Sequence, residues 1–164
     1  MATPVESIRE ESPRSPHNSH SLNLAAALLL EAEATSHEIF LLPVNECAPA
    51  AARRRIGAAE GPASEGEALL DALRLVASEL VSNAVEHSDP APGGALFLAL
   101  VHAPGQVLLA VTDPGSNGGT TPHLRRTDWD AEGGRGLHLV DRCSAYWGVV
   151  VAPGATTVWA RLSS

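Results

Sequence analysis

Glu79-Leu80-Val81-Ser82-Asn83-Ala84-Val85-Glu86-His87 is the stretch around which the rest of the chain is organised. Apolar residues recur at spacings of three and four between positions 69 and 84, which predicts a helix with one buried face. Because each helical residue turns by about 100°, Glu79, Asn83 and His87 fall on one polar stripe that borders this face. Taken alone, the stripe fits either a solvated helix side or the wall of a cleft.

Two glycine-containing segments later in the chain favour the cleft. Asp113-Pro114-Gly115 follows an apolar, strand-like run, and Gly133-Gly134-Arg135-Gly136-Leu137 precedes a short helical pattern. Glycines let a backbone approach phosphates closely, and the start of a helix offers unpaired N–H groups and a favourable dipole. An Asp before Pro-Gly is by itself also an ordinary turn former. The three segments in this order together predict one nucleotide site.

The composition excludes several classes of protein. The chain has 164 residues, of which 45% are hydrophobic, which suits one compact domain with an additional tail. It contains no lysine, so a phosphate-loop lysine, a eukaryotic-type kinase lysine and Schiff-base chemistry are excluded. A net charge of -8 disfavours a nucleic-acid partner, which needs concentrated positive charge.

The two thiols and the longest apolar run indicate a cytoplasmic protein. Cys47 and Cys143 have no metal-like spacing, and free buried thiols are expected, with a disulfide as the alternative. The apolar run Leu22–Leu30 is too short to span a bilayer and follows no cationic region, so neither a membrane span nor a signal peptide is predicted. The basic run Arg53–Arg55 is expected to be a solvated helix face, with docking of an acidic partner as the alternative.

The periodicity predicts an amino-terminal extension, residues 1–37, with room for one short helix, followed by one domain over residues 38–164. The domain is predicted to be an α/β fold (an α+β sandwich), with a mixed, mostly antiparallel sheet and helices packed on one face. The loop 114–134 is expected to be a lid over the nucleotide. Strands are predicted over 38–44, 95–101, 107–112, 146–151 and 156–162, and helices over 48–59, 66–87 and 136–143.

With these motifs the chain resembles the GHKL superfamily of gyrase, heat-shock chaperone, histidine-kinase and mismatch-repair ATPases, most closely its bacterial anti-sigma factor and serine-kinase branch. Glu79-x-x-x-Asn83-Ala84-x-x-His87 is similar to the family's Asn-containing helix, and Asp113-x-Gly115 to its adenine-side segment. The segment from Gly134 to Leu137 is similar to its second glycine segment, and Thr156-Thr157-Val158-Trp159 to its closing strand. The resemblance covers residues 38–162 and implies a Bergerat-type fold that binds ATP and Mg²⁺.

The resemblance also implies roles for the helix residues. Asn83 would coordinate Mg²⁺ through its side-chain oxygen, in keeping with the preference of this ion for hard oxygen ligands. Glu79 would be the general base that accepts a proton from a substrate hydroxyl or orients a water. His87 is included among the ATP-binding residues, although a structural or capping role is the more frequent one for such a histidine.

Further residues would hold the base and the phosphates of ATP. By the resemblance, Asp113 would accept a hydrogen bond from the adenine amino group, with Gly115 beside it and Thr157 as a supporting contact on a neighbouring strand. The family's adenine-side segment has a second glycine where this chain has Asn117. The expected phosphate-side residues are Gly133, Gly134, Arg135, Gly136 and Leu137.

The leading functional hypothesis is therefore a kinase that phosphorylates a serine or threonine of an antagonist protein and controls a sigma factor. A non-catalytic module, in which ATP only stabilises a partner-binding shape, is the second hypothesis, and the missing second glycine favours it. The catalytic part of a sensor histidine kinase is disfavoured because no phosphoacceptor helical hairpin is predicted. By the resemblance, an isologous homodimer is expected.

Overall fold

The computed structural model describes residues 34–59, 66–88, 94–113, 135–152 and 155–163. In this part of the chain, five strands form one sheet in the order β1-β2-β3-β5-β4, and every neighbouring pair is antiparallel. The predicted α/β fold is confirmed, and no parallel pairing occurs between the described strands. The strands are β1 (Ser36–Pro43), β2 (Ala95–Ala103), β3 (Gln106–Asp113), β4 (Tyr146–Ala152) and β5 (Ala155–Ser163), and the helices are α2 (Ala48–Ala59), α3 (Glu67–His87) and α4 (Arg135–Cys143).

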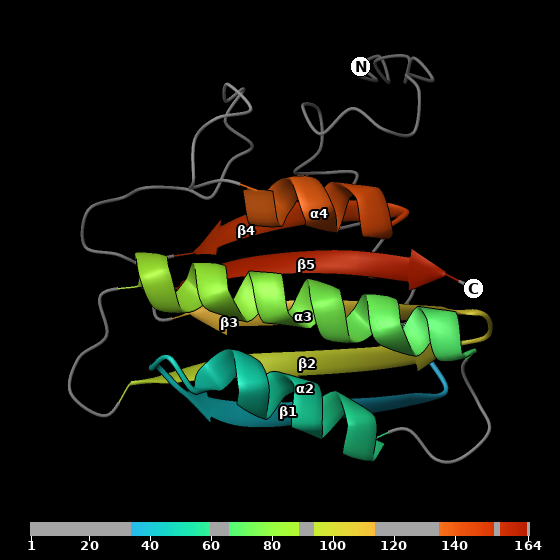
Figure 1. The fold of residues 1–164 in the computed structure, drawn as a ribbon, viewed down its shortest axis with the longest axis horizontal. Helices are drawn as coiled ribbons and strands as arrows, with labels where there is room; N and C mark the ends of the chain where they lie inside the picture. Colours follow the sequence, from blue (N-terminus) through green and yellow to red (C-terminus); the bar gives the residue numbers. More distant parts are fainter. Residues whose placement is uncertain (1–33, 60–65, 89–93, 114–134, 153–154, 164) are drawn as a thin grey trace, which may run out of the picture.

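The described helices all cover the same face of the sheet (Figure 1). Helix α3 lies across the middle and packs on β3 and β5, whereas α2 packs on β1 and α4 on β4. Both outer helices also contact α3. Leu73, Val76 and Leu80 of α3 are at most 1% exposed, as the predicted apolar face requires. The core therefore lies between α3 and the central strands.

Alternation along the strands separates the helix-facing side of the sheet from its outer face. In β2, Leu96, Leu98 and Leu100 are buried beneath the helices, while Phe97 points outward and is 48% exposed. This two-residue period follows from the pleat of a strand. Strand β1 begins at Ser36, slightly before the expected residue 38.

The turn before α2 explains the position of one thiol. The Asn45 side chain accepts a hydrogen bond from the Cys47 N–H at 2.9 Å, and the Ala48 N–H donates to the Asn45 carbonyl at 3.0 Å. Cys47 is thereby held in an exposed turn, and Cys143 is half-buried; both thiols are free. The expectation of free thiols is confirmed, but Cys47 is not buried. Within the described ranges no helix combines the length and hydrophobicity needed to cross a bilayer.

Candidate functional site

The polar stripe of α3 lies at the border of the core. Glu79 and Asn83 are half-buried, whereas His87, the last residue of the helix, is exposed. Their neighbours Leu80 and Ala84 are buried against the sheet and fix the rotation of the helix. A carboxylate and a carboxamide are thus held beside apolar packing, partly shielded from water.

Beneath this stretch of helix, a polar spot interrupts the apolar layer of the sheet. Asp113, the last residue of β3, is 7% exposed, and its register partner Thr156 of β5 is 8% exposed. They are the two buried polar side chains among the described residues. Burial of a carboxylate costs free energy unless hydrogen bonds compensate. Such a group in an otherwise apolar layer is suited to recognise a ligand by hydrogen bonding.

The register places Thr157 on the outer face of the sheet, and its predicted contact with the nucleotide stays a prediction. Its hydroxyl lies 2.8 Å from that of Thr112, its partner across the β3–β5 pair, on the outer face of the sheet. Because successive side chains of a strand point to opposite faces, Thr156, and not Thr157, stands beside Asp113 on the helix-facing side. The sequence-based prediction did not include Thr156. The alternation along β5 could have indicated it, because Val158, Ala160 and Leu162 point to the same face as Thr156 and are buried under the helices.

The first turn of α4 abuts the stripe of α3. A Cβ atom placed on Gly136 would lie 2.6 Å from Oε2 of Glu79, so this glycine permits the close approach of the two helices. Leu137 is 7% exposed and belongs to the core, where it anchors α4. The first turn of α4, where the positive end of the helix dipole lies, is therefore beside Glu79, and negative charge is favoured near this end of the helix.

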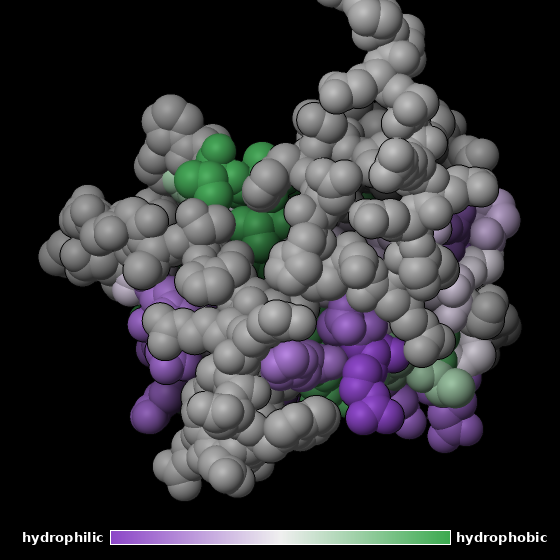
Figure 2. Space-filling view, turned by 90° about the horizontal axis from the view of Figure 1, so that it is seen from above, coloured by the Kyte–Doolittle hydropathy of each residue, from purple (hydrophilic) through white to green (hydrophobic). Residues whose placement is uncertain are grey.

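The predicted segments therefore converge at one end of the sheet (Figure 1). The carboxyl-terminal half of α3, the end of β3, the start of β5 and the start of α4 lie together on the left of that view. From the edge formed by β4 and α4, Figure 2 shows hydrophobic and hydrophilic surface side by side between the grey residues. Gly115, Gly133, Gly134 and the proposed lid lie outside the described residues, as does the side chain of Arg135.

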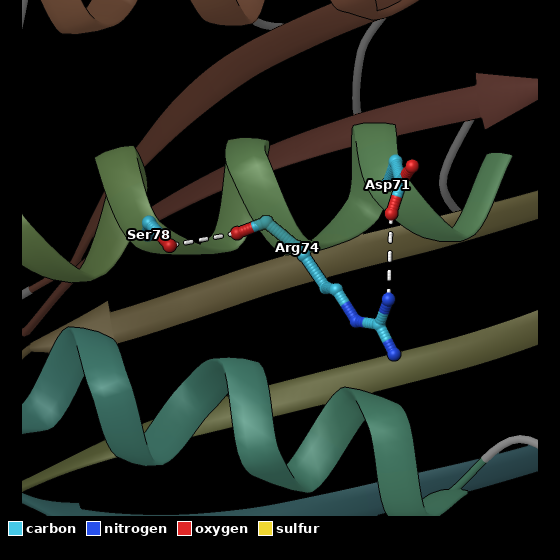
Figure 3. Close-up of polar contacts among 3 residues, drawn as sticks. All are labelled: Asp71, Arg74 and Ser78. Carbon is cyan, nitrogen blue, oxygen red and sulfur yellow. Dashed lines mark hydrogen bonds and ion pairs between the residues drawn. The ribbon is translucent and has the colours of Figure 1, made fainter. Parts of the chain in front are cut away.

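One side-chain hydrogen bond joins α2 to α3, and further polar contacts lie within α3. Arg53 Nη1 donates to Ser78 Oγ at 2.9 Å, and Ser78 Oγ donates to the Arg74 carbonyl at 2.7 Å. Arg74 extends toward α2 and pairs with Asp71 at 3.3 Å (Figure 3). The Arg55 guanidinium lies 5.7 Å from the Phe40 ring centroid. Arg53 and Arg55 make these contacts within the domain, and all three arginines of the basic run are exposed.

The donor set fits a nucleotide with Mg²⁺ better than a protein-only metal centre. No group of three His, Cys, Asp or Glu side chains able to hold a metal occurs in the described ranges. Asn83 offers an amide oxygen, a ligand type that Mg²⁺ accepts alongside phosphate oxygens and water. Asn83 would hold the ion, Asp113 and Thr156 lie where a base can be recognised, and the start of α4 is suited to phosphate.

Comparisons with known proteins agree with this geometry. The family model described as "Histidine kinase-like ATPase domain" matches residues 45–162. Among solved structures, the chain is similar to the RsbU and RsbW domains of Rv1364c from Mycobacterium tuberculosis, with a TM-score of 0.58 and 20% identity. The similarity covers 79% of this chain and 32% of that one, so this chain spans about a third of its length. No curated protein matches the sequence.

Proposed function

Because this chain belongs to the histidine kinase-like ATPase domain family, we propose that it is an ATP-binding regulator that phosphorylates an antagonist protein on serine or threonine and thereby controls a sigma factor. The observation that carries the nucleotide site is the approach of Gly136 to Glu79 at the end of the sheet where Asp113 and Thr156 are buried. This approach brings the helix stripe and the second glycine segment together.

The proposed chemistry assigns one task to each described side chain. Asp113 accepts a hydrogen bond from the adenine amino group, and Thr156 adds a hydroxyl beside it. The start of α4 binds phosphate oxygens through backbone N–H groups and its dipole. Mg²⁺, held by Asn83, supplies neutralisation of phosphate charge when bound.

Glu79 is the proposed general base. Its carboxylate accepts the proton of the serine or threonine hydroxyl while that oxygen forms a bond to the γ-phosphorus, and the bond to the β–γ bridging oxygen breaks to release ADP. The half-buried position of Glu79 and its proximity to Gly136 support a place for this carboxylate near the proposed phosphate-binding start of α4. Cytoplasmic location, a homodimer and the sigma-factor and antagonist partners are parts of the proposal that rest on the motif resemblance.

A non-catalytic ATP-dependent binding module is the second candidate. It is favoured by Asn117, which stands where the family's adenine-side segment has its second glycine. In that case the nucleotide would bind and stabilise a partner-competent shape without phosphate transfer. The two candidates share the nucleotide site and differ only in the use of Glu79.

Calorimetric titration of ATP with and without Mg²⁺ tests the site. Asp113→Asn should abolish binding, and Asn83→Ala should abolish the magnesium-dependent part of it. Asp71→Asn and Asn45→Ala are matched controls, because both residues are exposed and neither belongs to the proposed site. Unchanged affinity in Asp113→Asn would refute the proposed adenine contact.

Transfer of labelled γ-phosphate to a cognate antagonist then separates the candidates. Glu79→Gln should keep ATP binding and lose transfer, whereas Glu86→Gln, an exposed glutamate of the same helix, should keep both. Full transfer by Glu79→Gln would exclude the general-base role. A wild-type protein that binds ATP without transfer would support the binding module.

A further inference from the structure

The outer face of the sheet carries an apolar cluster that is almost fully buried. Ala103, Leu108 and Trp159 form this outer cluster and are 3%, 7% and 3% exposed. Toward the β1 edge of the same face, Leu41 and Phe97 face each other in register and are 64% and 48% exposed. Water is thus excluded from the part of the face over β3 and β5 and reaches the part over β1.

Among the described residues, Val101, Ala110 and Val150 pack against the outer cluster, but they are its neighbours in the sheet itself and form no layer over it. Helices α2, α3 and α4 lie on the opposite face (Figure 1). The register partners of Trp159 are Ala110 and Gly148, whose side chains are too small to cover an indole. Trp159 Nε1 is also buried and has no hydrogen-bond partner among the described residues. A further apolar group must therefore lie over the outer cluster.

The chain enters the described domain next to this cluster. Thr35 donates to the His102 carbonyl from its backbone N–H at 2.7 Å and from its hydroxyl at 3.2 Å, and His102 adjoins Ala103. Leu30 precedes Thr35 by five residues, which span up to about 17 Å when extended. Strand β5 lies three strand spacings from β1, which Thr35 precedes, or about 14 Å. The outer cluster is within reach of the segment that ends at Leu30.

We propose that residues 22–30 of this chain, Leu-Asn-Leu-Ala-Ala-Ala-Leu-Leu-Leu, pack on the outer cluster as an intramolecular cap. Eight of these nine residues are apolar, so the segment matches the chemistry of the buried patch and gains free energy by leaving water. Charged residues are absent from the segment, which avoids burial of an unpaired charge against the sheet. This contact is independent of the nucleotide site and of the proposed kinase activity.

Quenching of Trp159 fluorescence by acrylamide tests the cap in the full-length chain. In a Trp129→Phe, Trp147→Phe background, Trp159 is the single reporter. Leu28→Ser, Leu29→Ser and Leu30→Ser together should raise the quenching constant severalfold and shift emission to longer wavelength. Val5→Ser and Ile8→Ser, which alter apolar residues of the same extension outside the run, should leave both unchanged. Equal quenching in the two variants would overturn the proposal.

A photo-crosslinking amino acid at position 29 tests the same contact without destabilising substitutions. Intramolecular crosslinks to β3 or β5 are expected, with the product at monomer mass. Crosslinks only between two chains would overturn the proposal in favour of a second copy as the cover. Crosslinks confined to residues outside the sheet would overturn it as well.

Discussion

At the scale of single residues, the proposed site depends on the missing side chain of Gly136 and on the face of the sheet that Thr156 occupies. Gly136 leaves the space that the Glu79 carboxylate occupies, and Thr156 is placed beside Asp113 by a register that turns Thr157 away. Both features involve distances of a few ångströms, which is the scale at which phosphoryl transfer is sensitive to position. Each can be tested by a substitution that changes a single group.

Gly136→Ala should reduce phosphate transfer more than ATP affinity. The added methyl would lie 2.6 Å from Glu79 Oε2, so the carboxylate must rotate away, and a displacement of this kind can cost about a hundredfold in rate. Stability should be unchanged or raised by up to about 1 kcal/mol, because alanine favours a helix over glycine. Gly66→Ala, which meets no atom within 4 Å, is the control for kcat, KM and thermal unfolding. Undiminished kcat in Gly136→Ala would contradict the prediction.

Thr156→Val and Thr157→Val form a matched pair at the adenine side. Thr156→Val should weaken ATP binding by about 1 kcal/mol because it removes the hydroxyl beside Asp113. Thr157→Val should leave the affinity unchanged and lower the unfolding free energy by about 1 kcal/mol, through loss of the bond to Thr112. Calorimetric titration and urea unfolding distinguish the two, and a reversed pattern would show that Thr157 is the ligand contact.

At the scale of elements, the sequence predicts the helices and strands well and the contacts between them poorly. Helix α3 was expected over 66–87 and spans Glu67–His87, because its apolar period is long and regular. The choice between two adjacent threonines at the start of β5 depends on which face each occupies, and only pairing with β3 fixes that. The approach of Gly136 to Glu79 is likewise a contact between distant segments. The sequence could not predict the burial of Thr156 beside Asp113 or the exposure of Cys47, and the roles of the stripe and the glycine segments stay predictions.

The junction of α2 with α3 should show modest energetic coupling between Arg53 and Ser78. Their hydrogen bond of 2.9 Å is solvent-exposed, so a double-mutant cycle with Arg53→Ala and Ser78→Ala should give about 0.5 kcal/mol in chemical unfolding. Arg54→Ala, paired with the same Ser78→Ala, should give no coupling. A coupling energy of zero for Arg53 would show that this contact does not position the helix that carries the site.

At the scale of the whole molecule, ATP binding and stability are linked because ATP binds the folded state, in which α3, α4 and the central strands form the proposed site, and not the unfolded chain. Saturating ATP should therefore raise the midpoint temperature of thermal unfolding. At an ATP concentration one hundred times the dissociation constant, the free energy of unfolding should rise by about 2.7 kcal/mol. Asp113→Asn should abolish this increase, and Asp71→Asn should retain it. Differential scanning calorimetry measures the effect, and an unchanged midpoint of the wild-type protein at saturating ATP would contradict a site built across these elements.

The position of β5 in the sheet has a consequence for folding of the chain during its synthesis on the ribosome. The last described strand along the chain is inserted between β3 and β4 and is not an edge strand. A nascent chain that lacks β5 can form the β1–β2–β3 part of the sheet but has no strand opposite Asp113, so the β3–β5 and β4–β5 pairings must wait until residues 155–163 have left the exit tunnel. Incomplete chains are therefore expected not to bind nucleotide during synthesis. The ability to bind nucleotide should arise in one step after β5 has left the exit tunnel.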